Sequence, residues 1–124
     1  MTRLAVAALL LAAACHGRDD ERGRIIDDSY DAYEEMAQAV ADSPDCAEAT
    51  IAVDGVRAVR IAELTAAADL QNDPEQMKAA AGAFADRADR YRQVSGELDA
   101  ALSRCTGDPA FDAAVDRFMS TSGD

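Results

Sequence analysis

The sequence has no tryptophan and only one histidine, and each shortage excludes a class of site. Without tryptophan, and with aromatic residues at 5% of the chain, an aromatic cage for a ligand is not expected. The single histidine, His16, excludes a histidine-based zinc site, the Glu-x-x-His di-iron motif of helix bundles and Cys-x-x-Cys-His haem attachment. His16 is therefore interpreted as a solvated residue, and no cofactor is expected.

Basic residues are also scarce, with 12 lysines and arginines against 24 aspartates and glutamates, for a net charge of −12 at pH 7. Such an acidic surface repels phosphate groups, so nucleic acid is not expected as a partner. Basic partners or weakly held cations would fit this charge better. The alternative is that the acids only solvate the surface.

Motifs for catalysis are missing as well. The sequence has no phosphate-binding loop and no Gly-x-Ser-x-Gly motif, and no histidine in the expected folded region could activate Cys46 or Cys105. We therefore predict that the chain is not an enzyme.

An acidic cluster is the only candidate metal site. Asp27, Asp31 and Glu34 share one face of an expected helix, where a divalent cation could contact two carboxylates. A dedicated calcium site, however, gathers about six to eight oxygens from a turning loop. The favoured interpretation is that these acids complement the positive end of the helix dipole.

The longest apolar run covers residues 4–14, after the basic Arg3. This run is too short to cross a bilayer as a helix, which takes about 20 residues. A basic start, a short apolar segment and small residues at its end are the features of a secretory signal peptide. The sequence therefore predicts export, with residues 1–14 as the signal.

The residues before Cys15 resemble the lipobox of bacterial lipoproteins, in which small residues precede an invariant cysteine. Such boxes usually carry leucine three places before the cysteine, where this chain has Ala12, with Leu11 one place earlier. The resemblance implies cleavage before Cys15 and lipidation of its thiol, and two acyl chains anchor a protein stably. His16, in place of the aspartate that retains such proteins at the inner membrane, implies the outer membrane. The alternative is an ordinary signal cut near Ala14.

The rest of the chain resembles small helical lipoproteins of bacterial envelopes. Asp45-Cys46 opens a helix, and Cys105 precedes a Gly107-Asp108-Pro109 turn into a short last helix. The resemblance offers no catalytic residues to carry over.

The remaining cysteines predict a disulfide. If Cys15 carries lipid, Cys46 and Cys105 are an even pair in an exported chain, where disulfides form and persist. The alternative is a pair of buried free thiols. In a simple antiparallel hairpin of the second and third expected helices, the two cysteines would miss each other by roughly 8 Å along the axis. That is more than a disulfide tolerates, so the pairing requires a kink, a tilt or fraying.

Hydrophobic periodicity and proline positions predict an all-α domain. We expect a flexible charged tether over 15–24, a helical bundle domain over 25–119 and a disordered C-terminus over 120–124. The predicted architecture is an antiparallel bundle of three long helices with a short fourth. The expected helices, with starts marked by Ser43-Pro44, Asp73-Pro74 and Asp108-Pro109, are 25–42, 44–70, 74–105 and 109–119. Gly55, inside the second, indicates either a kink or the close approach of another helix.

The third expected helix carries a strict heptad pattern, which we call the seam. A seam held for four repeats is typical of left-handed helix packing, and it could instead drive self-association. Its residues are Met77, Phe84, Tyr91, Leu98 and Cys105, with Ala81, Ala88, Ser95 and Leu102 four places after the first four.

Two functions fit these observations. The first is a non-enzymatic envelope lipoprotein that acts as a structural or protein-interaction module, with exposed apolar residues contacting the partner. The candidate contact positions are Ile25, Ile26, Val56, Val59 and Ile61. The second is a small-ligand or divalent-cation binding protein of the periplasm or cell surface, which would use the acidic face or a pocket between helices.

Overall fold

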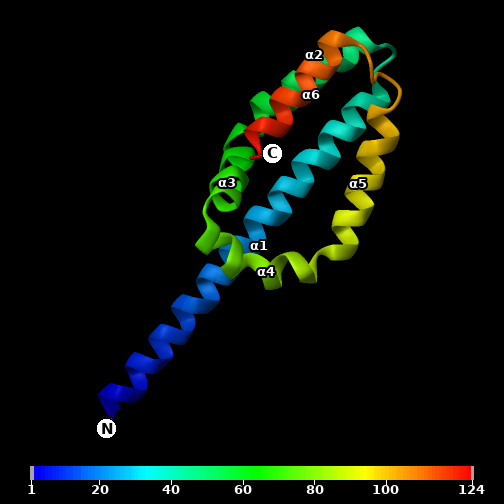
Figure 1. Ribbon diagram of the computed structural model, residues 1–124. Helices are drawn as coiled ribbons and strands as arrows, with labels where there is room; N and C mark the ends of the chain where they lie inside the picture. The colour runs from blue at the N-terminus through cyan, green and yellow to red at the C-terminus, as the bar shows by residue number, and fades with distance from the viewer. Residues whose placement is uncertain (1, 124) are drawn as a thin grey trace.

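A computed structural model of the chain describes the backbone of residues 2–123 and the side chains of residues 19–123 (Figure 1). Within that part the chain is all-α, as predicted, without a strand. The predicted count of three long helices and a short fourth is wrong, because the second and third expected helices each divide in two. The six helices are α1 (Thr2–Asp42), α2 (Cys46–Val59), α3 (Ile61–Asn72), α4 (Pro74–Asp86), α5 (Ala88–Leu102) and α6 (Pro109–Thr121).

The two breaks fall at Arg60 and Arg87, whose backbones leave helical geometry with φ/ψ of −101°/16° and −109°/15°. Each guanidinium binds a carboxylate of α1. Arg60 Nε donates to Glu35 Oε2 at 2.7 Å, and Arg87 Nε donates to Asp27 Oδ1 at 2.7 Å. Arg87 Nη1 also donates to the carbonyl oxygen of Ala83 at 3.0 Å, which satisfies an acceptor at the end of α4. The bends thus turn the chain back toward α1.

Gly55 marks neither of the two features proposed for it. α2 continues through this residue, and a Cβ atom built there would meet nothing within 4 Å. The bend comes five residues later, at Arg60.

Aspartates start the later helices. Asp45, Asp73 and Asp108 each accept hydrogen bonds from backbone N–H groups of the first turn, at 2.8–3.2 Å. Proline follows the last two at the first helical position, as predicted, because its missing N–H has no intrahelical partner there. α2 begins at Cys46, later than predicted, because Asp45 rather than Ser43 is its cap.

α1 begins before Ile25, so the prediction of a flexible tether is wrong for residues 19–24. Arg22 pairs with Asp19 one turn earlier, at 3.1 Å, and donates to Gln76 Oε1 of α4 at 3.0 Å. Gly23 is buried beside the Arg87 guanidinium. These contacts stabilise the helical conformation of residues 19–24, a segment that has no apolar stripe of its own. The predicted lipidation site, Cys15, lies outside the residues whose side chains are described.

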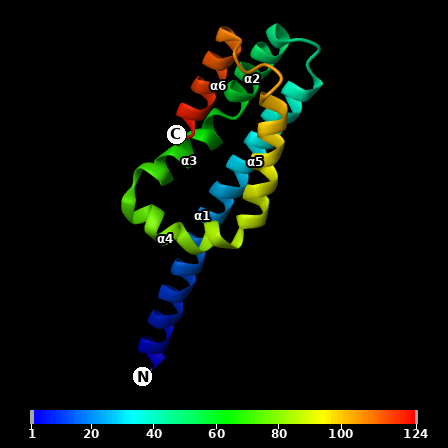
Figure 2. The same ribbon diagram turned by 45° about the vertical axis from the view of Figure 1, so that its right-hand side comes forward.

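α1 is the centre of the molecule (Figures 1 and 2). It packs against α2, α3, α4 and α5, while α6 packs against α2 and α3. α4 crosses α1, and α5 then runs beside it toward the far end of the bundle. Among the described residues, no Cα atoms of α2 and α5 lie within 8 Å of each other, so the antiparallel hairpin considered for the second and third expected helices does not form.

The core has two parts. The larger lies between α1, α2 and α6, near the end where α1 stops, and the smaller lies where α3, α4 and α5 meet α1. The largest fully buried side chains of the first are Met36, Val40, Val53, Leu64, Phe111 and Phe118. The second consists of Ile26, Tyr30, Leu70, Ala80 and Val94.

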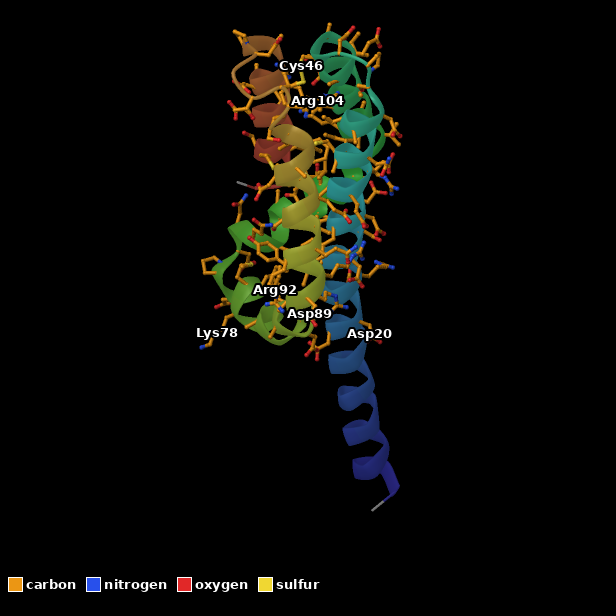
Figure 3. The ribbon with its side chains drawn as sticks, turned by 90° about the vertical axis from the view of Figure 1, so that its right-hand side faces the viewer. Asp20, Cys46, Lys78, Asp89, Arg92 and Arg104 are labelled. Carbon is orange, nitrogen blue, oxygen red and sulfur yellow. A yellow bond between two sulfur atoms is a disulfide. The ribbon has the colours of Figure 1, made fainter. Side chains whose placement is uncertain are left out.

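Cys46 and Cys105 lie at disulfide-bonding distance, with Cα atoms 5.6 Å apart (Figure 3). The predicted mismatch along the axis applied to a simple antiparallel hairpin. It does not arise here, because the segments that carry the two cysteines meet near the C-terminal end of α1. Arg104, next to Cys105, donates from Nη2 to the carbonyl oxygens of Val40 at 2.8 Å and Ser43 at 2.7 Å. A positive charge at a helix C-terminus is favourable, so Arg104 stabilises the contact between the end of α1 and the segment that carries Cys105.

The C-terminus is ordered farther than predicted. α6 extends to Thr121, and Ser122 is fully buried. The Tyr33 hydroxyl of α1 donates to Ser122 Oγ, which in turn donates to the carbonyl oxygen of Met119 at 2.9 Å. The prediction of disorder from residue 120 is therefore wrong through residue 123, because α1 supplies a buried partner.

Candidate functional site: an apolar pocket between the helices

The seam packs against other helices over only part of its length, where Phe84, Leu98 and Leu102 contact the core. The break at Arg87 divides it between α4 and α5, and most of its side chains are only half buried. Tyr91 remains 58% exposed. The seam also faces a cavity of about 620 Å³, and six of its nine residues line that cavity, namely Met77, Phe84, Ala88, Tyr91, Ser95 and Leu98.

The other walls of this cavity, which we call the pocket, come from α1, α3 and, through Met119, α6. Ile25, Ile26 and Tyr30 line it from α1, and Ala67 and Leu70 from α3. Its volume falls in the range of about 300–1,000 Å³ that is typical of sites for small molecules. The wall is mostly apolar, so burial of a ligand's hydrocarbon surface would be the main source of affinity.

Two tyrosines supply polar groups to the pocket. Tyr30 is only 7% exposed, and its ring centroid lies 6.3 Å from that of Tyr91. Both residues line the cavity, and within the described part of the chain their hydroxyls have no hydrogen-bond partner and are accessible to solvent. Burial raises the pKa of Tyr30 above its usual value, and the nearby Tyr91 adds to this effect. Tyr30 is therefore a protonated hydrogen-bond donor at neutral pH.

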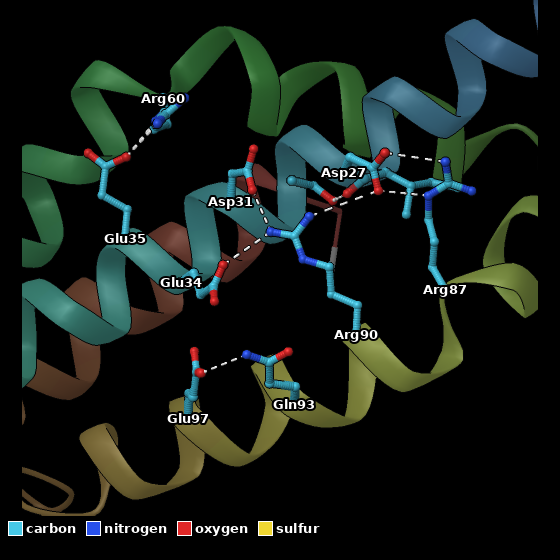
Figure 4. A network of polar contacts seen from close by, with 11 residues as sticks. Asp27, Asp31, Glu34, Glu35, Arg60, Arg87, Arg90, Gln93 and Glu97 are labelled. Carbon is cyan, nitrogen blue, oxygen red and sulfur yellow. Dashed lines mark hydrogen bonds and ion pairs between the residues drawn. The ribbon is translucent and has the colours of Figure 1, made fainter.

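The predicted acidic cluster lies beside the pocket and is paired with arginines (Figure 4). Arg90 of α5 binds both Asp31 and Glu34, the latter at 3.1 Å from Nη2 to Oε2, while Arg87 binds Asp27. The structure thus brings the three predicted carboxylates to one face, but it gives them guanidinium partners. Over residues 19–123 no three His, Cys, Asp or Glu side chains are arranged to hold a metal ion.

The arginines were missed as partners of this cluster because the sequence places Arg90 near Asp86, at a spacing that favours a pair within one helix. The sequence nevertheless contains a signal for this pairing between helices. Arg87 and Arg90 are one turn apart, as are Asp27 and Asp31, so two parallel or antiparallel helices could match them.

The exposed apolar residues differ in part from those predicted. Val59 and Ile61 are exposed, by 73% and 42%, and Ile51 of α2 joins them at 66%. Ile26 and Val56 are buried, which corrects the prediction that they contact a partner, because they point into the two parts of the core.

No helix in the part of the chain with described side chains is long and apolar enough to span a membrane. Comparisons of the chain with protein-family models, curated proteins and solved structures find no match.

Proposed function

We propose that this chain is a non-enzymatic, lipid-anchored envelope protein that binds a small apolar ligand in the pocket between α1, α3, α4 and α5. The observation that carries the proposal is that six of the nine seam residues line a cavity. Apolar surface left exposed to water costs free energy, at about 25 cal/mol for each Å². A ligand that covers the stripe would recover this free energy.

The position of the pocket supports the same proposal. It lies beside the smaller part of the core, while the disulfide junction and the larger part of the core hold the other end of the bundle. One end is therefore fixed independently of the site, and a ligand could enter without disturbing the main core. Anchoring through Cys15 would place such a site close to a membrane surface, with the outer membrane as the expected location.

The experiment is a titration of the full chain carrying Cys15→Ser, which prevents lipid attachment, with the neutral fluorescent compound N-phenyl-1-naphthylamine. Ser95 lines the pocket from the middle of α5, and Ser95→Phe should fill part of it. We expect saturable binding by the parent protein and a loss of affinity of at least about tenfold in Ser95→Phe.

Gln93→Phe is the matched control, because it adds the same ring to the exposed face of the same helix. Its affinity should equal that of the parent. Circular dichroism and thermal unfolding establish that both variants fold. Absence of saturable binding by the parent, or equal affinity in both phenylalanine variants, would contradict the proposal.

Protein–protein interaction is a second candidate function, supported by the exposed apolar side chains Ile51, Val59 and Ile61 around the α2–α3 bend. A photo-crosslinking amino acid placed at Val59 in intact cells should capture an envelope protein or a second copy of the chain. The same amino acid at the exposed Asp99 of α5 is the control. Recovery of monomer alone from position 59, or the same products from both positions, would exclude this function.

A further inference from the structure

We infer that the ligand of the pocket is a single-chain amphiphile with an uncharged head group that accepts hydrogen bonds, such as an ester or amide. This inference rests on the proposed function and names the ligand class for that same site. It is argued from two unpartnered hydroxyl groups and from the charges that surround them.

The first step concerns the two tyrosines. Tyr30 is 7% exposed and Tyr91 is 58% exposed, and both line the pocket, where neither hydroxyl has a hydrogen-bond partner among the described residues. A ligand that covers these hydroxyls removes them from water, and a buried polar group left without a hydrogen bond costs free energy. Since both phenols are donors when protonated, an acceptor on the ligand would replace the water.

The contrast with Tyr33 supports this reading. Tyr33 is on the same helix, one turn after Tyr30, and its hydroxyl donates to Ser122 Oγ. Both tyrosines line the pocket, but the fold provides an acceptor for the Tyr33 hydroxyl and none for that of Tyr30. The two tyrosines differ because the buried turn at the C-terminal end of α6 reaches the Tyr33 hydroxyl.

The second step concerns charge. Arg90 lies over the Tyr30 ring, with Cζ 6.0 Å from its centroid, but it also binds Asp31 and Glu34. With Arg87 bound to Asp27, three carboxylates face two guanidinium groups beside the pocket. The local charge is therefore negative, and the whole chain carries −12. A carboxylate or phosphate head group would be repelled, whereas an uncharged acceptor would not.

The third step concerns the rest of the ligand. Apart from the tyrosines, the wall is formed mainly by aliphatic and aromatic side chains such as Ile26, Leu70, Phe84 and Leu98. These groups offer no hydrogen bonds, so the part of the ligand that contacts them is a hydrocarbon chain. Affinity should increase with chain length until the pocket is full.

The test compares three compounds with the same 12-carbon chain: glycerol monolaurate, dodecanoate at pH 8 and dodecane. Each displaces N-phenyl-1-naphthylamine from the full chain carrying Cys15→Ser. We expect the ester to bind at least about tenfold more tightly than either of the others, as two hydrogen bonds would provide. Tyr30→Phe/Tyr91→Phe should reduce the ratio of ester to dodecane affinity to about one.

Tyr33→Phe is the matched control, since it removes from the pocket wall a hydroxyl that already has a protein partner. It should keep the preference for the ester. The inference is overturned if dodecanoate or dodecane binds as tightly as the ester, or if the double variant keeps the preference. In those cases displacement still occurs and the proposed function stands, whereas failure of the naphthylamine itself to bind overturns both.

Discussion

Arg87, the residue at which the predicted third helix breaks, is joined to Asp27 of α1 by two hydrogen bonds, at 2.7 Å from Nε and 3.2 Å from Nη2. This bidentate pair sits where α4 leaves α1 and α5 begins. α4 crosses α1 before this point (Figure 1), and six of the nine seam residues line the cavity on either side of the break. One ion pair thus connects the bend in the chain with the candidate site.

The Arg87–Asp27 pair should contribute a measurable coupling energy. In a double-mutant cycle with Arg87→Gln and Asp27→Asn, we expect a coupling of about 0.5–1 kcal/mol in the free energy of unfolding, because both side chains are partly exposed. Urea denaturation measures it. The pair Arg92–Asp89 is far more exposed and is the control, with no coupling beyond experimental error. Equal couplings in the two cycles would refute the special role of Arg87.

The disulfide should be the largest single contribution to stability. The bridge closes a segment with a sequence separation of 59, so Cys46→Ser/Cys105→Ser should lower the free energy of unfolding by about 2–4 kcal/mol. Denaturation with and without a reductant measures this loss, and reduced parent protein should behave like the double variant. Cys15→Ser is the control and should leave the stability unchanged. Alkylation of both thiols in unfolded, unreduced protein would disprove the bond.

The stability of the protein should fall at high pH because of Tyr30. Burial raises the pKa of Tyr30 in the folded state, so its stabilising contribution is complete below about pH 10, the usual pKa of an unfolded tyrosine. That contribution is lost as the pH rises through the folded pKa. We expect the free energy of unfolding to decline less above pH 10 in Tyr30→Phe than in the parent. Parallel declines in the two proteins would contradict this assignment.

Two glycines should respond in opposite directions to alanine. Gly123 has φ +96°, and a Cβ atom there would lie 3.1 Å from the Ala68 Cα atom, so Gly123→Ala should destabilise the protein by about 1 kcal/mol or more. Gly55 lies in the middle of α2 with open space around it, so Gly55→Ala should stabilise by about 0.5–1 kcal/mol. Thermal unfolding measures both, and a shift of the same sign in the two variants would be inconsistent with the structure.

Much of the local structure could be predicted because its causes lie within a few residues. Asp73 and Asp108 cap their helices through backbone N–H groups two or three positions away, and the prolines after them fix the first helical turn. Gly107, at φ +97°, lies after the end of α5 in the turn that the sequence indicates, where glycine adopts the left-handed conformation common at helix ends. Such signals can be recognised in the sequence without knowledge of the fold.

The breaks and both ends of the folded region could not be predicted in this way. Arg60 and Arg87 look like ordinary helix residues, and at the breaks their side chains bind Glu35 and Asp27 on α1, which are far away in the sequence. Ser122 is polar and near the chain end, but Tyr33 gives it a buried partner 89 positions away. These partners come together only after the chain has folded.

The sequence by itself determined the helical class, the caps at Asp73 and Asp108 and the apolar seam, because each depends on short-range spacing, and it predicted the pairing of Cys46 with Cys105 from residue counts. Only the tertiary structure decided whether the cysteines meet and what the seam faces. The third expected helix breaks at Arg87, and most of the seam residues line a pocket. The physical reason is that periodicity specifies which side chains share a face, whereas long-range ion pairs and close packing determine what that face meets.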